Sequence, residues 1–362
     1  MINNLPPNTI EYRGRLLLKT DTEKLLYRRG KLIYEVDNIK KVYKLNKYCK
    51  GIKKLAIKFR FFERLLRLEP RCACKTNDGI IFSYQKSIYR INYDGQLIKE
   101  HTFREGMNNP LSFTEIKGLG SFEEGVLYGE YWANPKREGV AIWHRNNQGD
   151  WKKVFTFEPK QLKHIHCIVP DIDNERLLVL TGDSDEESNI WEIKDNFKKV
   201  DLLVGGAQKY RSCVAFIHNG DLIYATDTPL EDNFIYKLKK GESTAEKLFQ
   251  LQGSCIYGTS FIDKQGIKQF VFITAVEPDS SLKGWRYKLT NKLGKGIKSR
   301  YSYINLLSEN GEFKVLMKAK KDFLPMCLFQ FGNFRVSEIN KGFAVTGQAL
   351  RKYDERTIEF DL

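Results

Sequence analysis

Short runs in which apolar and polar residues alternate cover most of the 362-residue chain. The run KLIYEV (31–36), which follows a turn at Arg29-Gly30, is typical, and such alternation predicts a strand with one buried face. The strands come in groups of three or four, separated by turns that contain Gly or Asn-Asp, and the group recurs roughly every 40 to 50 residues. After a first group before Lys50, the copies span 72–103, 126–157, 165–203, 212–251, 254–324 and 334–362.

A repeat of this length, built from short antiparallel strands, is typical of a blade of a β-propeller. The groups predict seven blades, with six as the alternative. No linker rich in Pro, Gly or Ser interrupts the series, so we predict one all-β domain over residues 1–362. A pair of β-sandwiches would need a break near the middle of the chain. The C-terminal run TIEFDL (357–362) is expected to pair with the N-terminal strands and close the ring.

One segment departs from the strand pattern. In 50–69 (KGIKKLAIKFRFFERLLRLE) apolar residues recur at spacings of three and four among many lysines and arginines, and Pro70 follows. This spacing predicts one inserted basic amphipathic helix. We expect the helix to pack on the flank of the domain. The alternative is a peripheral helix at a membrane surface, with salt-sensitive binding to anionic lipid.

The charge balance favours an anionic partner. The chain has 60 Lys and Arg against 45 Asp and Glu, a net charge of +15. Such a field suits an acidic glycan, nucleic acid or anionic lipid head groups. Because no recognisable nucleic-acid module is present, we predict no specific nucleic-acid partner.

The seven cysteines are odd in number and scattered, which disfavours a disulfide framework and favours a reducing compartment. We find neither an apolar signal-peptide region near the N-terminus nor an apolar stretch long enough to span a membrane. We therefore predict a cytoplasmic protein.

In a propeller the first strand of each blade lines a central channel, where polar side chains can form a ligand site. The first strands of the repeats supply a set rich in His, Tyr and Arg. Its members are Arg71, Tyr128, Glu130, Tyr131, His164, His166, Gln208, Tyr210, Arg211, Tyr257, Asn333 and Arg335.

The sequence Lys163-His164-Ile165-His166 places two imidazoles on one face of a strand. Imidazole titrates near neutral pH and can act as a general acid or base. We predict His164, His166 and Tyr257 as catalytic residues. As metal ligands the two histidines lack a third partner, for which Asp171 or Asp183 is conceivable, so we predict neither a metal nor a cofactor. Motifs of nucleotide-binding loops, serine hydrolases and zinc proteases are absent from the sequence.

Arginines can hold a carboxylate through two parallel hydrogen bonds. We predict a substrate-binding set around such a carboxylate, made of Arg211, Arg335, Arg137, Tyr128, Glu130 and Gln208. Arg286 is a reserve cation, and Glu130 and Glu277 are alternative acids. The acidic stretch 183–187 lacks the spacing of a calcium loop and is interpreted as a solvated loop.

The segment HRNNQGDWKKVFTF (144–157) resembles a degenerate Asp-box turn of sialidase-type propellers, with Asn146 and Trp151 at the aspartate and tryptophan positions. Together with YGEY, KHIH, TGDSD and GGAQKYR, it makes 121–210 similar to sialidase-like propellers associated with polysaccharide metabolism. The resemblance implies a carbohydrate pocket. The sialidase set of an arginine triad, a tyrosine with a glutamate, and an aspartate is not found. Polysaccharide lyases on propellers use His, Tyr and Arg around a uronate, which these residues match better.

We therefore predict a carbohydrate-active propeller that acts on an acidic oligosaccharide or polysaccharide, as a glycoside hydrolase or a polysaccharide lyase. The alternative is a non-catalytic glycan-binding or scaffold propeller in cytoplasmic surface-polysaccharide metabolism.

Overall fold

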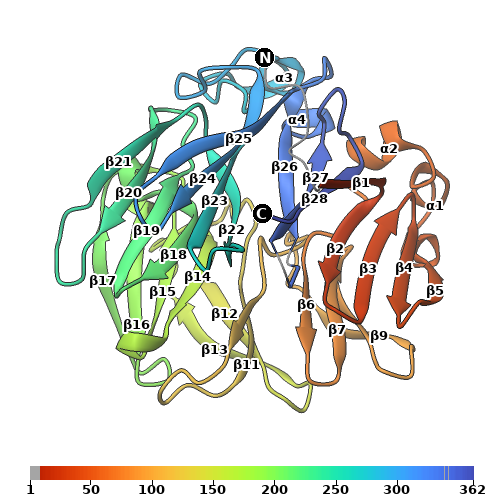
Figure 1. Ribbon diagram of the computed structural model, residues 1–362, viewed down its shortest axis with the longest axis horizontal. Coiled ribbons are helices and arrows are strands. Elements are labelled where there is room, and N and C mark those ends of the chain that lie inside the picture. Colours follow the sequence, from red (N-terminus) through yellow and green to blue (C-terminus); the bar gives the residue numbers. More distant parts are fainter. Residues whose placement is uncertain (1–8, 338, 341) are drawn as a thin grey trace. The chain divides into compact units, whose positions relative to one another are not determined.

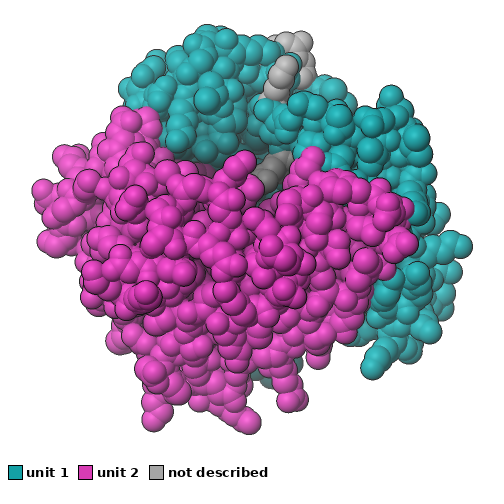
Figure 2. Space-filling view, turned by 90° about the horizontal axis from the view of Figure 1, so that it is seen from below, with its two compact units in different colours: residues 1–69, 227–235, 247–362 teal, residues 70–226, 236–246 magenta. Residues whose placement is uncertain are grey.

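The protein is an all-β, seven-bladed β-propeller, as the repeat predicts (Figure 1). The computed structural model describes residues 9–337, 339–340 and 342–362. Within these residues the strands form seven four-stranded antiparallel sheets, and each sheet follows the chain order with one exception. The chain divides into two compact units, which Figure 2 colours separately.

Unit 1 comprises residues 1–69, 227–235 and 247–362 and holds three complete sheets. The first contains β2 (Arg15–Lys19), β3 (Glu23–Arg28), β4 (Lys31–Val36) and β5 (Ile39–Lys44). The second contains β22 (Cys255–Ile262), β23 (Lys268–Thr274), β24 (Tyr301–Ser308) and β25 (Phe313–Lys320). The third contains β26 (Asn333–Ser337), β27 (Phe343–Gln348), β28 (Arg356–Phe360) and β1 (Thr9–Arg13).

The third sheet is the exception to chain order, because its outer strand comes from the other end of the chain. β1 pairs antiparallel with β28, with Thr9 opposite Phe360 and Arg13 opposite Arg356. The predicted pairing of the C-terminal run with an N-terminal strand is thus confirmed. This pairing covers the edge of β28, which would otherwise expose unpaired backbone groups.

Unit 2 comprises residues 70–226 and 236–246. Its first sheet contains β6 (Ala73–Thr76), β7 (Gly79–Tyr84), β8 (Ser87–Ile91) and β9 (Leu97–Thr102). The next contains β10 (Thr114–Ile116), β11 (Gly125–Gly129), β12 (Val140–Arg145) and β13 (Trp151–Phe157). The third contains β14 (Ile165–Asp171), β15 (Arg176–Thr181), β16 (Asn189–Lys194) and β17 (Lys199–Gly205).

The remaining sheet contains β18 (Ser212–His218), β19 (Asp221–Thr226), β20 (Asn233–Leu238) and β21 (Glu246–Leu251). Its first two strands belong to unit 2, and the rest of this sheet is divided between the units. The prediction of a single domain stays a prediction.

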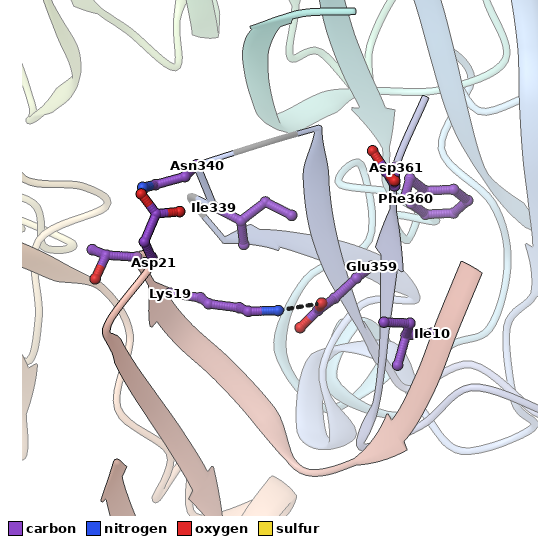
Figure 3. Close-up of a pocket in the computed structure, with 9 residues that line it drawn as sticks. Ile10, Lys19, Asp21, Ile339, Asn340, Glu359, Phe360 and Asp361 are labelled. Carbon is purple, nitrogen blue, oxygen red and sulfur yellow. Dashed lines mark hydrogen bonds and ion pairs between the residues drawn. The ribbon is translucent and has the colours of Figure 1, made fainter. Parts of the chain in front are cut away.

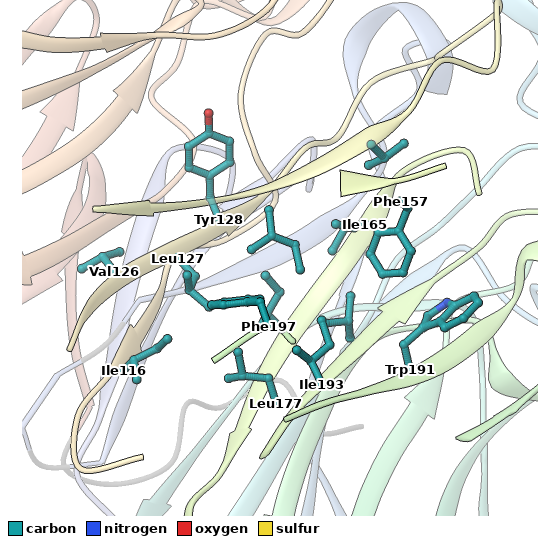
Figure 4. Close-up of a cluster of buried hydrophobic side chains, with 14 of the residues drawn as sticks. Ile116, Val126, Leu127, Tyr128, Phe157, Ile165, Leu177, Trp191, Ile193 and Phe197 are labelled. Carbon is teal, nitrogen blue, oxygen red and sulfur yellow. The ribbon is translucent and has the colours of Figure 1, made fainter. Parts of the chain in front are cut away.

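The core of unit 2 is a continuous cluster of apolar side chains from neighbouring sheets (Figure 4). Leu127 of β11, Leu177 of β15 and Ile193 of β16 are fully buried in it, and Phe157 packs against Trp191. Alternation along the strands supplies these inward side chains, and burying them is the main stabilising contribution of each blade.

The inserted segment is not one helix. It forms two short helices, α1 (Lys53–Ala56) and α2 (Arg60–Leu65), and a short 3₁₀ helix, η1 (Leu45–Tyr48), precedes it. Phe59, between α1 and α2, has extended backbone angles (φ −113°, ψ 122°), which break the predicted helix. The break turns charged residues of α2 inward, where Glu63 and Arg64 are buried. The spacing of apolar residues in 50–69 therefore does not predict which side chains of this segment are buried.

Two further short helices belong to unit 1, α3 (Gly284–Leu289) and α4 (Met326–Phe329). Among the described residues, no helix has the length and apolar character needed to cross a membrane.

Candidate functional site

The two predicted histidines meet at the start of β14. His164 precedes this strand, and His166 sits at a bulge where the register with β15 shifts between Ile165 and Cys167. Their Nε2 atoms lie 2.9 Å apart, and each residue is only 3% exposed. The predicted proximity is observed, but the imidazoles are buried beneath the surface and not at an open rim.

Asp183 lies beside the histidine pair. It follows β15 after Gly182, whose φ of +153° is a backbone conformation that favours glycine. Its Oδ1 is 3.5 Å from Nε2 of His164 and 3.6 Å from Nε2 of His166. The Asp183 side chain is 30% exposed, so it connects the buried pair to the surface.

Two cations hold the Asp183 carboxylate. Nζ of Lys163 is 2.5 Å from Oδ2, and Nη2 of Arg211 is 3.1 Å from Oδ1. Burial opposes the negative charge, but contacts with the two histidines and the charge of Arg211 outweigh it and lower the pKa of Asp183. The carboxylate is therefore ionised at neutral pH.

An aromatic ring also contacts the histidine pair. The ring of Tyr131 lies 4.4 Å from that of His164 and 6.1 Å from that of His166, between centroids. The guanidinium of Arg71 lies over the same ring, 5.1 Å from its centroid. Tyr131 is half-buried, so it forms part of the accessible surface above the histidines.

The hydrogen bonds assign the protons of the pair. Nδ1 of His164 is 2.9 Å from the backbone oxygen of Trp132, which can only accept, so Nδ1 donates. Neutral His164 then accepts at Nε2 from the Nε2–H of His166. Burial lowers the pKa of His164 although Asp183 acts against this, which favours the neutral form. Nδ1 of His166 is left with a lone pair and no hydrogen-bond partner among the described residues.

Arg211 and Gln208 contact this cluster through hydrogen bonds to the backbone of Asp183. Gln208 begins a 3₁₀ helix (Gln208–Tyr210) before β18 and Arg211 follows it, and Arg211 and Gln208 donate to the backbone oxygen of Asp183 at 3.1 and 3.0 Å. Gln208 also donates to Oδ1 of Asp185 at 2.9 Å. Both residues thus support Asp183, and Arg211 is engaged by a carboxylate of the protein itself.

The sequence predicts Tyr128 on the first strand of its sheet. The short strand β10 precedes β11 there, so Tyr128 lies on the second strand. Its hydroxyl lies 2.8 Å from Nε2 of His101, its ring stacks on Trp143, and it is only 1% exposed. Burial, with the charge of Glu130, raises its pKa, so the phenol stays protonated. Tyr128 is therefore a core residue.

Glu130 and Arg137 are likewise bound to the protein. Glu130 accepts from Arg104 at 3.0 Å, from the Ala141 amide at 3.0 Å and from the Trp143 indole at 3.2 Å. Arg137 pairs with buried Glu187 of the acidic stretch, which is therefore not simply a solvated loop. Their placement in an open pocket is not observed.

Tyr257 and Arg335 belong to unit 1. Tyr257, on β22, packs against the core of that unit, and Arg335, on β26, lies 3.8 Å from Oε2 of Glu69. Their predicted roles beside the histidines stay predictions. Asn333 is buried at the start of β26, and Tyr210 is buried against the backbone of Ser243.

The ligand atoms of His164, His166 and Asp183 lie within 4.8 Å of one another, a spacing that a metal ion could bridge. Asp171 cannot join them, because it is fully buried and paired with Arg176 at 2.7 Å. Asp183 is already neutralised by Lys163 and Arg211. A divalent cation bound by His164, His166 and Asp183 would add positive charge beside Lys163 and Arg211, which disfavours metal binding.

Sequence reasoning missed the role of Lys163 and the backbone oxygen of Trp132, and it named Asp183 beside the histidines only as a conceivable metal ligand. Asp183 comes from the turn after the neighbouring strand, so its approach depends on the pairing of β14 with β15. The only local signal was TGDSD, a glycine followed by an acidic turn.

The Asp-box-like segment forms the turn between β12 and β13. The side-chain oxygen of Asn146 accepts from the amides of Gln148 at 3.1 Å and Asp150 at 2.8 Å. Gly149 has a φ of +93°, and Trp151 begins β13. The segment is a structural turn in the sheet of β10 to β13, whereas the histidine cluster lies at the start of β14 in the next sheet.

Unit 1 contains a separate cavity of about 310 Å³ (Figure 3). Its polar walls include Asp21, Asp361 and the Lys19–Glu359 ion pair of 2.7 Å. Three carboxylates against one lysine make this cavity unsuited to an acidic ligand. None of the residues predicted for the substrate site lines it.

No family model matches the chain, and no curated protein matches it. Among solved structures, the CNH domain of AfRom2 is similar with a TM-score of 0.53 and 10% identity, covering 99% of this chain and 97% of that one. A puromycin-hydrolysing peptidase of Mycobacterium tuberculosis has a TM-score of 0.50 and 9% identity, covering 92% and 49%. A gluconolactonase of Xanthomonas campestris has a TM-score of 0.41 and 10% identity, covering 72% and 83%. At these identities, the similarities to the CNH domain and to the peptidase concern the fold alone.

Proposed function

We propose that unit 2 binds an acidic saccharide at the surface formed by Tyr131, Lys163 and Asp183. The observation that carries this proposal is the local charge. The carboxylate of Asp183 contacts both Lys163 and Arg211, and Arg71 adds a third cation on the ring of Tyr131. The two cations on the carboxylate of Asp183 make this region locally positive, which favours an anionic ligand.

The same surface suits a sugar. The half-buried ring of Tyr131 offers an apolar face on which a pyranose can stack. Lys163 and Asp183 are each 30% exposed, so they can reach a ligand on that face. A uronate would accept from Lys163 through its carboxylate and donate to Asp183 through a hydroxyl group.

The proposed reaction on this ligand is cleavage of a glycosidic bond. In elimination, a base removes the proton α to the carboxylate, the released electron pair forms a C=C bond, and the C–O bond to the leaving sugar breaks as that oxygen takes a proton. In hydrolysis, water adds across the broken bond instead. The unprotonated Nδ1 of His166 is the base that the cluster supplies, and the cations stabilise the negative charge that develops.

Binding without cleavage is the second candidate, as in a glycan-binding or scaffold propeller. It is favoured by the burial of both histidines and by the contacts of Arg211 with the backbone and the carboxylate of Asp183. Catalysis would require Tyr131 to move, whereas binding at the surface would not.

We also propose that the protein works in a reducing compartment, such as the cytoplasm. Cys255 is fully buried, and burial raises the pKa of Cys167 to about 12. Such protonated thiols are chemically inert and need no partner.

A screen of purified protein against acidic oligosaccharides and their neutral counterparts tests the proposal, with binding and products followed together. Elimination yields an unsaturated uronate, hydrolysis yields products heavier by one water, and a non-catalytic protein binds without products. Equal binding of the neutral counterparts would overturn the proposal in all three forms. A Lys152→Gln variant, which alters an exposed lysine elsewhere in unit 2, serves as the control.

A further inference from the structure

Unit 1 carries a surface on which basic and large apolar side chains are exposed together. It consists of residues 38–62, which run through β5, η1 and α1 into α2 along one side of the unit (Figure 1). This stretch, here called the basic–apolar surface, contains nine Lys and Arg and no Asp or Glu. Eight of the nine are exposed lysines: Lys40, Lys41, Lys44, Lys47, Lys50, Lys53, Lys54 and Lys58.

The apolar side chains of this stretch face water as well. Ile52 is 80% exposed and Phe59 is 53% exposed. The full set of exposed large apolar residues is Ile39, Val42, Ile52, Leu55, Phe59, Phe61 and Phe62. Single exposed apolar residues are ordinary on protein surfaces, whereas a gathering of this size marks an interaction site.

The packing of α2 is the inverse of an ordinary surface helix. Glu63 and Arg64 are buried, while Phe61 and Phe62 face outward. Arg64 donates to the backbone oxygen of Phe329 in α4 and pairs with Asp322 at 2.6 Å.

Arg60 adds further ion pairs on the inner side. It contacts Glu63 at 2.9 Å and Asp354 at 2.7 Å, and it also pairs with Glu69. A network of buried charges therefore fixes α2 with its aromatic residues outward. Because burying charge is costly and exposing Phe forgoes hydrophobic stabilisation, this arrangement favours a partner that receives the aromatic rings.

The helices α4 and α3 extend the basic–apolar surface. α2 packs against α4, with the ring of Phe61 4.5 Å from that of Phe329, and α4 packs against α3. On α3, Trp285 is 69% exposed, and Leu289 is exposed beside Arg286 and Lys288. The same combination of basic and apolar side chains is thus repeated on a neighbouring element.

We propose that the basic–apolar surface docks on a membrane that contains anionic lipids. The apolar side chains would enter the headgroup boundary, and the lysines would lie at the phosphate level with their alkyl stems among the lipids. Trp285 is of the residue type that is enriched at that depth. Charge complementarity identifies the lipid class, because the stretch carries positive charge alone.

Nucleic acid is the less suitable occupant. Single-strand binding relies on aromatic stacking and phosphate contacts, and Ile39, Ile52 and Leu55 have no aromatic face for a base. These exposed aliphatic side chains gain from entry into lipid but not from contact with a phosphate backbone.

Co-sedimentation of the full chain with vesicles tests the proposal. Vesicles of phosphatidylcholine are compared with vesicles that also contain phosphatidylserine, and single-stranded RNA is added as a competitor. The charge variant is Lys53→Glu/Lys54→Glu/Lys58→Glu, and the apolar variant is Leu55→Ser/Phe59→Ser/Phe62→Ser. The control is Lys117→Glu/Lys136→Glu/Lys198→Glu, which makes the same charge change at exposed lysines of unit 2.

We expect binding to vesicles with phosphatidylserine, weakening with added salt, and roughly a hundredfold loss in the charge variant. The apolar variant should bind more weakly at the same net charge, and the control should bind like the wild type. The proposal is overturned if the control loses as much binding as the charge variant, if the apolar variant binds unchanged, or if RNA displaces the protein from vesicles. Failure here leaves the acidic-saccharide proposal untouched, because the two surfaces are in different units.

Discussion

The Nε2 atoms of His164 and His166 lie 2.9 Å apart, so one imidazole must donate to the other. The backbone oxygen of Trp132 decides which, because it accepts from Nδ1 of His164. Together with Asp183 the pair forms a polar cluster that is buried yet linked to the surface. The two histidines next to Tyr131 therefore share a hydrogen bond, and the protonation of one depends on that of the other.

Unit 2 should lose stability in acid, because the partial burial of His101 opposes its protonation. Burial, opposed by the charge of Glu100, lowers the pKa of His101 from 6.5 to about 4. For a base with a lowered folded-state pKa, the contribution to stability is complete above 6.5 and is lost as the pH falls toward 4. Between pH 7 and 4.5 we expect the free energy of unfolding to fall, by about 1 kcal/mol from His101 after screening by water.

Urea unfolding of the wild type and of His101→Gln at several pH values measures this effect. In the variant, the free energy of unfolding should fall less steeply as the pH is lowered. Part of the decline should remain, because burial also lowers the pKa of His164. Parallel pH profiles for the two proteins would rule out the assigned role of His101.

Arg60→Ala should destabilise unit 1 by about 3 kcal/mol, because it leaves buried carboxylates without their cation. The partners that lose it are Glu63, Glu69 and Asp354. Chemical denaturation gives the difference, and Lys58→Ala, at an exposed position nearby, should change the free energy of unfolding by less than about 0.5 kcal/mol. Similar values for the two variants would contradict the role given to the Arg60 network.

Divalent metals should not stabilise the protein at the histidine cluster, because Lys163 and Arg211 already compensate Asp183. A thermal unfolding scan with Zn²⁺ or with a chelator should match the untreated protein. A ligand at about a hundred times its Kd would add about 2.7 kcal/mol. A stabilisation of that size, lost in a His164→Gln/His166→Gln variant, would refute the charge argument.

Asn146→Ala should cost about 1 kcal/mol of stability, because two backbone amides of the turn lose their acceptor. Asn146→Asp keeps an oxygen in place and should retain most of the stability. Neither variant should alter saccharide binding, since the turn is structural. Thermal unfolding and a binding assay on the same preparations check both statements, and a selective loss of binding would disprove the second.

Much of the fold could be predicted because strand alternation and turn residues are local features. The seven repeats and the pairing of β1 with β28 follow from them. β10 was missed because it spans only Thr114–Ile116, too short for alternation to show. The helical insertion was misread because spacing alone does not reveal that Arg64 is buried among acidic partners and Phe62 exposed.

The site was predictable only where it is local in the chain. His164 and His166 share a strand end, so their proximity follows from the period of two. Asp183 joins them through strand register and Arg211 through the next sheet, which sequence spacing cannot resolve. The ion pairs of Glu130 with Arg104 and of Arg137 with Glu187 join residues far apart in the chain, so sequence spacing did not reveal them.

The most direct test is a calorimetric titration of the protein with a uronate oligosaccharide and, separately, with the same oligosaccharide after reduction of its carboxyl groups. It measures binding at the surface proposed for unit 2. We predict that the wild type binds the acidic form at least roughly tenfold more tightly, since one charge-assisted contact is worth about 1.5–3 kcal/mol. Lys163→Gln should lose most of this preference, Tyr131→Ala should weaken binding of both sugars, and Lys152→Gln should bind as the wild type does. Equal affinity of the wild type for the two sugars, or a preference that survives in Lys163→Gln, would contradict the proposed function.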